Sequence, residues 1–245
     1  MKKLMVLALL LVLALAMLTA VAELPPVGDP GAPVHTHVSA RYLEHGVEET
    51  GAPNLVTAVL LNYRGLDTMG EVLVLFTALC AGFAVLLAAG GARRRAAADG
   101  EGGDQPAPPF IVVSPVVSFV VRLLAPFIAV FAAYVLFKGH LAPGGGFQGG
   151  MILGALFVAL TLVLGSERSS LLLPPGLRPW LYAAAPLAFL LVGLFGLLLT
   201  GSFLGYPVEP AWHQVRDAMM VMLEVAIGVG GAVLVASFFL LMETQ

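Results

Sequence analysis

The residues best suited to chemistry in this chain are acids inside or beside long apolar runs. Glu224 stands between Leu223 and Val225 in the last apolar run, and Asp217 precedes it by seven residues. On a helix this spacing puts both acids on one face, roughly 10 Å apart along the axis, and His213 extends the stripe. An ionised group in hydrocarbon costs on the order of 3 kcal/mol, so such acids face protein, water or ions. The neutral form of a carboxyl group is easier to bury than the charged form, which suits proton carriage; a buried acid bonded to a neighbouring helix is the alternative.

A second set of charges lies at i, i+3 and i+7 in the first half of the chain: Arg64, Asp67 and Glu71. On a continuous helix the three side chains share one face, and the two acids are one turn apart. Arg64 would then neutralise one carboxylate and leave the other free to take up a proton or a cation. The alternative is an ion pair at the level of the lipid headgroups that ends a helix, and the breaks offered by Gly65 and Gly70 favour it.

A glycine-rich segment in the second half follows Lys138 and His140. Histidine titrates near neutral pH, so His140 is a candidate proton carrier. Glycines beside membrane helices indicate either close packing of backbones or irregular backbone that lines a cavity. We therefore expect His140 and this loop to shape an aqueous access route on the outer side. The alternative is that Lys138 and His140 are ordinary loop residues. The loop comprises Pro143, Gly144, Gly145, Gly146, Phe147, Gly149 and Gly150.

The elements that must position these residues are membrane helices. Apolar residues make up 59% of the 245 residues and charged residues 11%, against about 45–50% and 25% in soluble domains. A run of about 20 apolar residues is long enough for a helix to cross a bilayer. We predict an all-α polytopic membrane protein with about six transmembrane helices, or five if a signal peptide ending at Ala22 is removed. The predicted spans are residues 4–22, 69–89, 116–137, 150–164, 180–200 and 218–241.

The segments between these spans carry few signals of their own. Residues 23–53 are predicted to be a solvated loop, and residues 54–61 a short helix at the membrane level. His35 and His37 lack the neighbours of a metal site, and Cys80 is the only cysteine, so no metal site is predicted. The net charge of −3 gives no basic face for nucleic acid.

The basic residues indicate the orientation of the chain, since they concentrate on the cytoplasmic side. With the N-terminus inside, six spans return the C-terminus to the cytoplasm. The cytoplasmic side then holds Lys2, Lys3, Arg93, Arg94, Arg95, Arg168 and Arg178, and the other side holds only Arg41, Lys138 and Arg216.

Two motifs resemble a known family. Residues 138–150, after an apolar span, resemble the signature of the MrpB (MnhB) subunit of multisubunit Na⁺/H⁺ antiporters. Residues 54–71 resemble the C-terminal segment of the large MrpA subunit, a module that is a small separate subunit in Mrp-linked membrane-bound hydrogenases. Asn62 and Tyr63 stand where that segment usually has Asp and Phe, whereas Arg64, Asp67 and Glu71 match.

The resemblance implies a fused module: an MrpA-like part (residues 1–92), a flexible cytoplasmic linker (93–113) and an MrpB-like four-helix part (114–245). It implies a subunit of a hetero-oligomeric complex in the cell membrane that moves Na⁺ and H⁺, with antiporter-like large subunits and small membrane subunits as partners. No catalytic residues and no cofactor are expected in this chain. A membrane-arm subunit of a hydrogenase or related oxidoreductase, and a purely structural membrane subunit, are the alternatives. The sequence does not separate these three, and it does not fix the ion.

Overall fold

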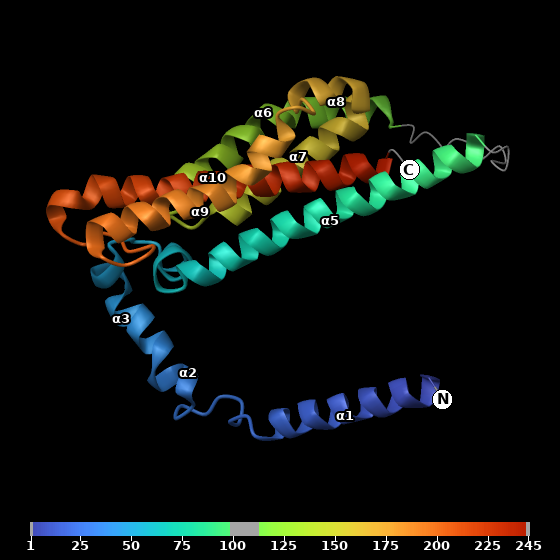
Figure 1. Cartoon of the computed structure of the whole chain (residues 1–245). Helices are drawn as coiled ribbons and strands as arrows, with labels where there is room; N and C mark the ends of the chain where they lie inside the picture. The colour runs from blue at the N-terminus through green and yellow to red at the C-terminus, as the bar shows by residue number, and fades with distance from the viewer. Residues whose placement is uncertain (1, 99–112, 244–245) are drawn as a thin grey trace. The chain divides into compact units, whose positions relative to one another are not determined.

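The computed structural model describes residues 2–98 and 113–243, and in these ranges all regular secondary structure is helical (Figure 1). Within these ranges six helices are long and apolar enough to cross a membrane, which confirms the predicted fold class. They are α1 (Lys2–Ala22), α5 (Gly65–Ala98), α6 (Pro115–Phe137), α7 (Gly146–Leu164), α9 (Arg178–Thr200) and α10 (His213–Glu243).

Shorter helices fill segments that the apolar runs do not reach. The prediction of a solvated loop at 23–53 is wrong for α2 (Pro33–Thr36) and α3 (Val38–Thr50). The apolar residues of α3 recur at i and i+4, as in Val38 and Tyr42, which is the pattern of an amphipathic helix. Such a helix contains no continuous apolar run. The remaining short elements are α4 (Leu55–Thr57), a π-helical segment (Ala58–Tyr63), α8 (Ser166–Leu172) and a 3₁₀ turn (Pro210–Trp212).

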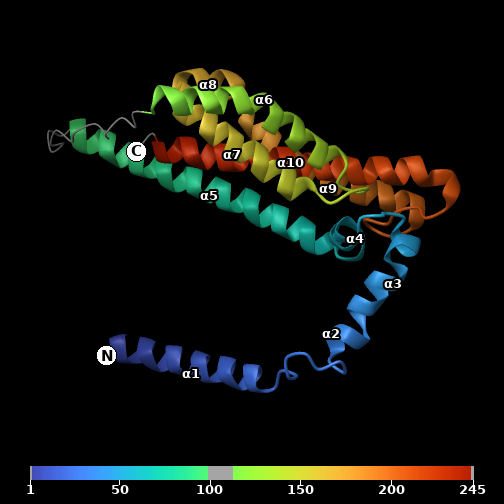
Figure 2. The same ribbon diagram turned by 180° about the vertical axis from the view of Figure 1, so that it is seen from behind.

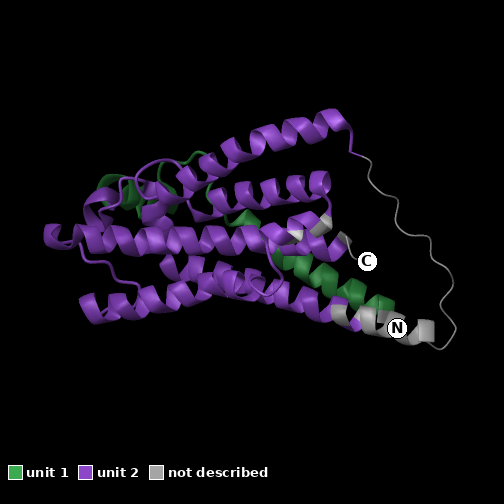
Figure 3. Cartoon of the chain, turned by 90° about the horizontal axis from the view of Figure 1, so that it is seen from above, with its two compact units in different colours: residues 1–45 green, residues 46–245 purple. Residues whose placement is uncertain are grey.

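The chain divides into two compact units, residues 1–45 and 46–245 (Figure 3). The first unit holds α1, whose described side chains are all exposed. α5 is helical to Ala98 and so includes the first residues of the predicted linker, whereas residues 99–112 of that linker lie outside the described residues. The division into residues 1–92, 93–113 and 114–245 stays a prediction.

In the second unit, α7 packs against both α6 and α10, α10 packs against α9, and α5 packs against α9 and α10 (Figure 2). Glycines bring α7 close to its neighbours. A Cβ atom at Gly150 would lie 2.5 Å from the Gly228 carbonyl oxygen of α10, and one at Gly149 would lie 2.6 Å from Leu136 Cγ of α6. Small residues at four-residue spacing let membrane helices approach in this way.

The glycine-rich segment is therefore only partly a loop. Residues from Gly146 onward belong to the first turns of α7, so the span predicted at 150–164 begins four residues earlier. The composition left close packing of backbones and irregular backbone as alternatives, and close packing holds from Gly146 onward. Gly146, Gly150 and Gly154 recur every four residues on one helix face, where a side chain would meet α10.

Of the two helix breaks that Gly65 and Gly70 suggested, the structure has only the first. The π-helical segment ends at Tyr63, α5 begins at Gly65, and Gly70 lies inside α5 without interrupting it. Asp67 and Glu71 therefore share one helix, and the span predicted at 69–89 starts earlier.

The core of the second unit lies where the π-helical segment, the start of α5, α9 and α10 meet. Leu61, Phe189, Met220 and Leu223 are its most enclosed large side chains, each at most 2% exposed. Leu223 immediately precedes Glu224 on α10. The packing of this core therefore fixes the position of the buried acid.

Candidate functional site: a buried carboxylate at the start of α7

Glu224 of α10 is a carboxylate enclosed by protein, with only 3% of its surface exposed. The hydroxyl group of Thr57 donates a hydrogen bond to Glu224 Oε1 over 2.9 Å. The backbone N–H of Gly146 donates a short hydrogen bond to Glu224 Oε2. Both carboxylate oxygens therefore have a donor, which a buried acid requires if it is to carry charge.

The Gly146 donor is available because it lies in the first turn of α7. The first N–H groups of a helix have no acceptor within the helix, and the helix dipole places partial positive charge there. Gly145 precedes the helix with φ 148° and offers no side chain as a cap. Glu224 occupies the place of a capping residue, so α10 supplies from a distant part of the sequence what α7 lacks locally.

Glycine at 139 and 146 is needed to bring the backbone this close to the acid. A Cβ atom at Gly139 would lie 2.9 Å from Glu224 Cδ, and one at Gly146 would lie 2.5 Å from the Glu224 carbonyl oxygen. A larger residue at either position would push α10 away from the loop. The glycine-rich motif thus serves the acid directly.

Asn54 and Thr57 tie the first half of the chain to this loop. Asn54 caps α4 by accepting a hydrogen bond from Val56 N over 3.0 Å. Its Nδ2 donates to the carbonyl oxygens of Gly139 (2.6 Å) and Ala142 (2.9 Å). The cap fixes the turn that presents Thr57 to Glu224, and the two amide bonds hold the loop against it.

A small cavity lies beside the acid. Its volume of about 10 Å³ is at the lower limit for a single water molecule. Polar side chains from several segments line it, namely Thr57, Thr68, Gln148 and Glu224, together with the backbone of residues 144–146. The remaining lining is apolar, so the site is small and mixes a few polar groups with hydrophobic side chains.

Two further titratable side chains lie near this end of the second unit, outside the spans. Tyr206 is 6% exposed, and its hydroxyl group has no hydrogen-bond partner within the described residues. Burial, followed by the charge of Glu224, raises the pKa of Tyr206. Burial lowers the pKa of His140, and this effect outweighs the attraction of Asp217, while Lys138 and Arg216 lower it further.

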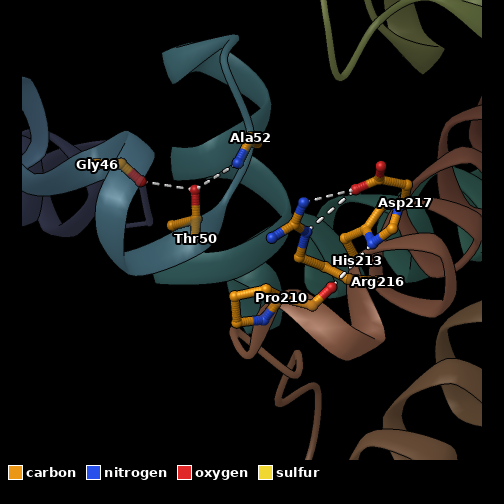
Figure 4. A network of polar contacts seen from close by, with 7 residues as sticks. All are labelled: Gly46, Thr50, Ala52, Pro210, His213, Arg216 and Asp217. Carbon is orange, nitrogen blue, oxygen red and sulfur yellow. Dashed lines mark hydrogen bonds and ion pairs between the residues drawn. The ribbon is translucent and has the colours of Figure 1, made fainter.

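A separate polar cluster surrounds Arg216 (Figure 4). Arg216 is paired with its neighbour Asp217, with 3.0 Å between Nη2 and Oδ1. A side chain at Gly51, where φ is +70°, would overlap the Arg216 guanidinium, so the guanidinium packs directly on that backbone. His213 Nδ1 lies 2.9 Å from the Pro210 carbonyl oxygen at the start of α10.

The structure brings together only some of the residues singled out from the sequence. Glu224 and the glycine-rich segment meet. His213 and Asp217 share α10 with Glu224, as the spacing predicts, but the bonds described above give each of them a different partner.

The charges at the start of α5 lie apart from this site. Arg64 Nε and Asp67 Oδ2 are 2.5 Å apart, with 62% and 55% of the two side chains exposed. Glu71 and Lys138 are exposed as well. This fits the alternative of an exposed ion pair better than an enclosed pair of acids.

Sequence reasoning missed three residues that build or border the site: Asn54, Thr57 and Tyr206. Asn is a preferred N-cap residue, and Asn54 stands directly before the apolar run that begins at Leu55, so this signal could have identified it. Nothing local identifies Thr57, because its partners lie 82 and 167 residues further along the chain.

Sequence profiles of two families match the chain. Domains related to the MnhB subunit of Na⁺/H⁺ antiporters match residues 116–239, which is half of the chain, and the MbhE family, described as the E subunit of MBH, matches residues 5–100. An uncharacterised protein of Methanocaldococcus jannaschii is 28% identical over 212 residues, covering 78% of this chain and 76% of that protein. A probable K⁺/H⁺ antiporter protein of Rhizobium meliloti, its A/B subunit, is 28% identical over 192 residues, which cover 71% of this chain but only 18% of that larger protein.

Two solved structures resemble the chain over almost its whole length. A chain of the membrane-bound sulfane sulfur reductase, an archaeal respiratory membrane complex, matches with a TM-score of 0.62 at 28% identity, covering 97% of this chain and 98% of that one. A chain of the Mrp complex from Dietzia sp. DQ12-45-1b matches with a TM-score of 0.57 at 26% identity, covering 96% of this chain and 26% of that one. The two resemblances stated from the motifs are confirmed. The chain belongs to the family of domains related to the MnhB subunit of Na⁺/H⁺ antiporters and carries an MbhE segment ahead of that domain.

Proposed function

We propose that this chain is a membrane subunit of a multisubunit Mrp-type complex and contributes to the exchange of monovalent cations against protons. Its relatives support membership of such a complex, because they include a probable K⁺/H⁺ antiporter protein and chains of an Mrp complex and of a respiratory membrane complex. The chain spans only a part of the antiporter protein and of the Mrp chain. A role of this chain in their transport activity is therefore a proposal.

The enclosed carboxylate of Glu224 is the observation that carries this proposal. An acid in the apolar interior of a membrane protein is costly unless it has a role, and this one lies beside a cavity of about the size of one water molecule. Its two donors stabilise the ionised form, while its burial favours the protonated form. Glu224 is therefore built to exist in both forms, as an exchanging group must.

The other candidate residues take supporting roles in the proposal. Asp67 and Glu71 remain candidates for proton or cation exchange, and their exposure on α5 leaves them open to water, lipid headgroups or a neighbouring subunit. Arg64 neutralises Asp67 through their ion pair. We assign His140, on which the charges of Asp217, Lys138 and Arg216 act, to the outer side of the route to Glu224.

The proposal is tested by changing Glu224→Gln in the complete complex. Glutamine keeps the shape and the hydrogen-bonding acceptor but cannot exchange a proton, so cation-driven proton movement in membrane vesicles should be abolished. Assembly, followed on a native gel, should be preserved. The matched control is Glu209→Gln, an exposed acid just before α10, which should leave exchange intact. Normal exchange by Glu224→Gln at full assembly would remove Glu224 from the ion route.

The type of complex is a separate question that purification answers. If the chain belongs to a hydrogenase or sulfur reductase arm, the tagged chain purified in mild detergent should bring down iron–sulfur proteins. If it belongs to an antiporter, it should bring down antiporter-like proteins alone. Exchange assays with Na⁺ and K⁺ in parallel identify the ion, since the family description and the Rhizobium relative name different cations.

A purely structural role makes a different prediction for the same variants. If the charges only hold subunits together, neutralising them should dissociate the complex on a native gel, and any loss of exchange should follow the loss of assembly. We also propose that both termini lie on the cytoplasmic side of the cell membrane. Reporter fusions at each end of the chain would test this.

A further inference from the structure

We propose that the hydroxyl group of Thr57 is a two-position donor that serves both protonation states of Glu224, turning between the acid and the Gly139 carbonyl oxygen as the acid loses or gains a proton. This inference rests on the proposed function, because it requires Glu224 to change protonation. It assigns a positioning role to a residue of the MbhE segment on an acid of the MnhB-related domain.

The geometry gives one hydroxyl proton two acceptors at the same distance. Thr57 Oγ1 lies 2.9 Å from Glu224 Oε1 and 2.9 Å from the Gly139 carbonyl oxygen. A threonine hydroxyl carries a single proton but can also accept a hydrogen bond, so it donates to only one of these oxygens at a time. Thr57 is 2% exposed, so within the protein its hydroxyl is enclosed.

Each protonation state of Glu224 selects one arrangement. With the acid ionised, Thr57 donates to Oε1, and the Gly139 carbonyl oxygen keeps the bond from Asn54 Nδ2 at 2.6 Å. With a proton from water on Oε1, the acid donates to Thr57 Oγ1, and Thr57 turns its own proton to the Gly139 carbonyl oxygen. The proton returns to water when the acid ionises, and Thr57 keeps its own proton throughout.

Neither protonation state leaves a buried group without a hydrogen-bond partner, because the Thr57 hydroxyl can either donate to the acid or accept from it. An unsatisfied buried donor or acceptor costs on the order of 1–3 kcal/mol, which would bias the acid toward one state. The Gly146 N–H stays on Oε2 in both arrangements. Because Asn54 already satisfies the Gly139 carbonyl oxygen, the Thr57 proton is free to leave it.

The charged and titratable groups around the acid, within the described ranges, are few. The charge of Glu224 acts on Tyr206, in the segment after α9, and helps to raise the pKa of that residue. Asp67 and Glu71 of α5 and Lys138 at the end of α6 are exposed, and the charges that act on His140 are those of Asp217, Lys138 and Arg216. A change at Thr57 therefore tests the hydroxyl, since it alters none of these charges.

The experiment is infrared difference spectroscopy of the purified complex between high and low pH. The carbonyl band of protonated Glu224 is identified by its absence in Glu224→Gln. In Thr57→Val, which has the same shape but no hydroxyl, the protonated acid loses its acceptor and the band should move to higher wavenumber. In Thr57→Ser, which keeps the hydroxyl, the band should stay in place. Native gels follow assembly of each variant.

Each outcome bears on one claim. A band that stays in place in Thr57→Val overturns the role of Thr57, even if Glu224 still titrates. If Thr57→Val does not assemble, Thr57→Ala replaces it as the variant without a hydroxyl: a band at higher wavenumber supports the role of Thr57, and an unmoved band overturns it. Absence of any band that depends on Glu224 contradicts the proposed function itself, so the two failures are distinguishable.

Discussion

The two sets of acids in this chain differ in how completely the chain encloses them. Glu224 is 3% exposed and has a donor on each oxygen, from Thr57 and from Gly146. Asp67 has 55% of its side chain exposed and its partner Arg64 has 62%, and Glu71 is exposed too. Both sets stand out in the sequence as charges beside apolar runs. The chain alone therefore completes one site and leaves the other for water, lipid headgroups or a neighbouring subunit.

The enclosure of Glu224 depends on a few places where backbones touch. α7 reaches the acid only because glycines allow it to lie against α6 and α10. The exposed acids on α5 need no such approach, and a Cβ atom at Gly70 beside them would meet nothing within 4 Å. Changes that add a methyl group should therefore separate the two regions.

The largest effect is expected for Gly150→Ala. The added Cβ atom would lie 2.5 Å from the Gly228 carbonyl oxygen, so α7 and α10 must move apart. Overpacking of this kind destabilises by about 1–3 kcal/mol. The thermal midpoint of the purified chain in detergent should fall clearly, and exchange should fall with it.

The matched control for this prediction is Gly70→Ala, also within a helix but with open space around it. It should keep or slightly raise the thermal midpoint, since alanine favours a helix over glycine by about 1 kcal/mol. Equal losses in the two variants would show that the glycines of α7 have no special role in enclosing the acid.

The next effect is expected for Asn54→Ala. The change removes the cap of α4 and both bonds from Nδ2 to the loop at Gly139 and Ala142. Loss of a cap alone costs about 0.5–2 kcal/mol, and the unpaired loop carbonyl groups add to it. Hydrogen exchange should then increase at residues 139–146, and Asn62→Ala serves as the control. An unchanged loop would mean that Asn54 does not hold it.

A smaller effect, confined to acid pH, is expected for His140→Gln. Burial holds the pKa of His140 below its usual value of 6.5, so the folded protein favours the neutral ring and the unfolded chain binds the proton more readily. The stabilisation from the neutral ring is complete above pH 6.5 and is lost as the pH falls toward the lower folded-state pKa. The thermal midpoint of the unmodified protein should therefore drop through this window, and that of His140→Gln should drop less. Parallel profiles would exclude His140 as the cause.

The smallest effect on the chain's own stability is expected for Asp67→Asn. Exposed ion pairs such as Arg64–Asp67 contribute at most about 1 kcal/mol, so the thermal midpoint should hardly change. Co-purification of partner subunits should decrease if the exposed acids face a neighbouring subunit. Glu209→Gln is the control for loss of an exposed acid. Full recovery of partners with Asp67→Asn would leave this region without an interface role.

The sequence predicts the fold well because hydrocarbon imposes one simple requirement. A run of apolar residues long enough to cross the bilayer is visible without knowledge of its neighbours, as at Pro115–Phe137 and Arg178–Thr200. The amphipathic helix α3 was not predicted because only one of its faces is apolar. The start of α7 was not predicted because glycine weakens a helix locally. Only contact with α10 explains why a helix forms there.

Only two parts of the candidate site were predictable from the sequence. Glu224 stands out as a charge within an apolar run, and the glycine-rich segment stands out by composition. Their meeting depends on the packing of α7 against α10, and the contribution of Thr57 depends on a loop that Asn54 holds from 85 residues away. Such contacts between distant segments leave no periodic pattern in a single sequence.

The central claim is that Glu224 exchanges a proton for a cation, and the most direct test counts protons. The purified complex in lightly buffered detergent solution receives a pulse of Na⁺ or K⁺, and a pH-sensitive dye reports the protons released as the cation displaces them. The account predicts that Glu224→Gln releases about one proton fewer per complex than the unmodified protein, since the ligand of a bound cation must be deprotonated. Equal release from both proteins, at equal assembly, would contradict it.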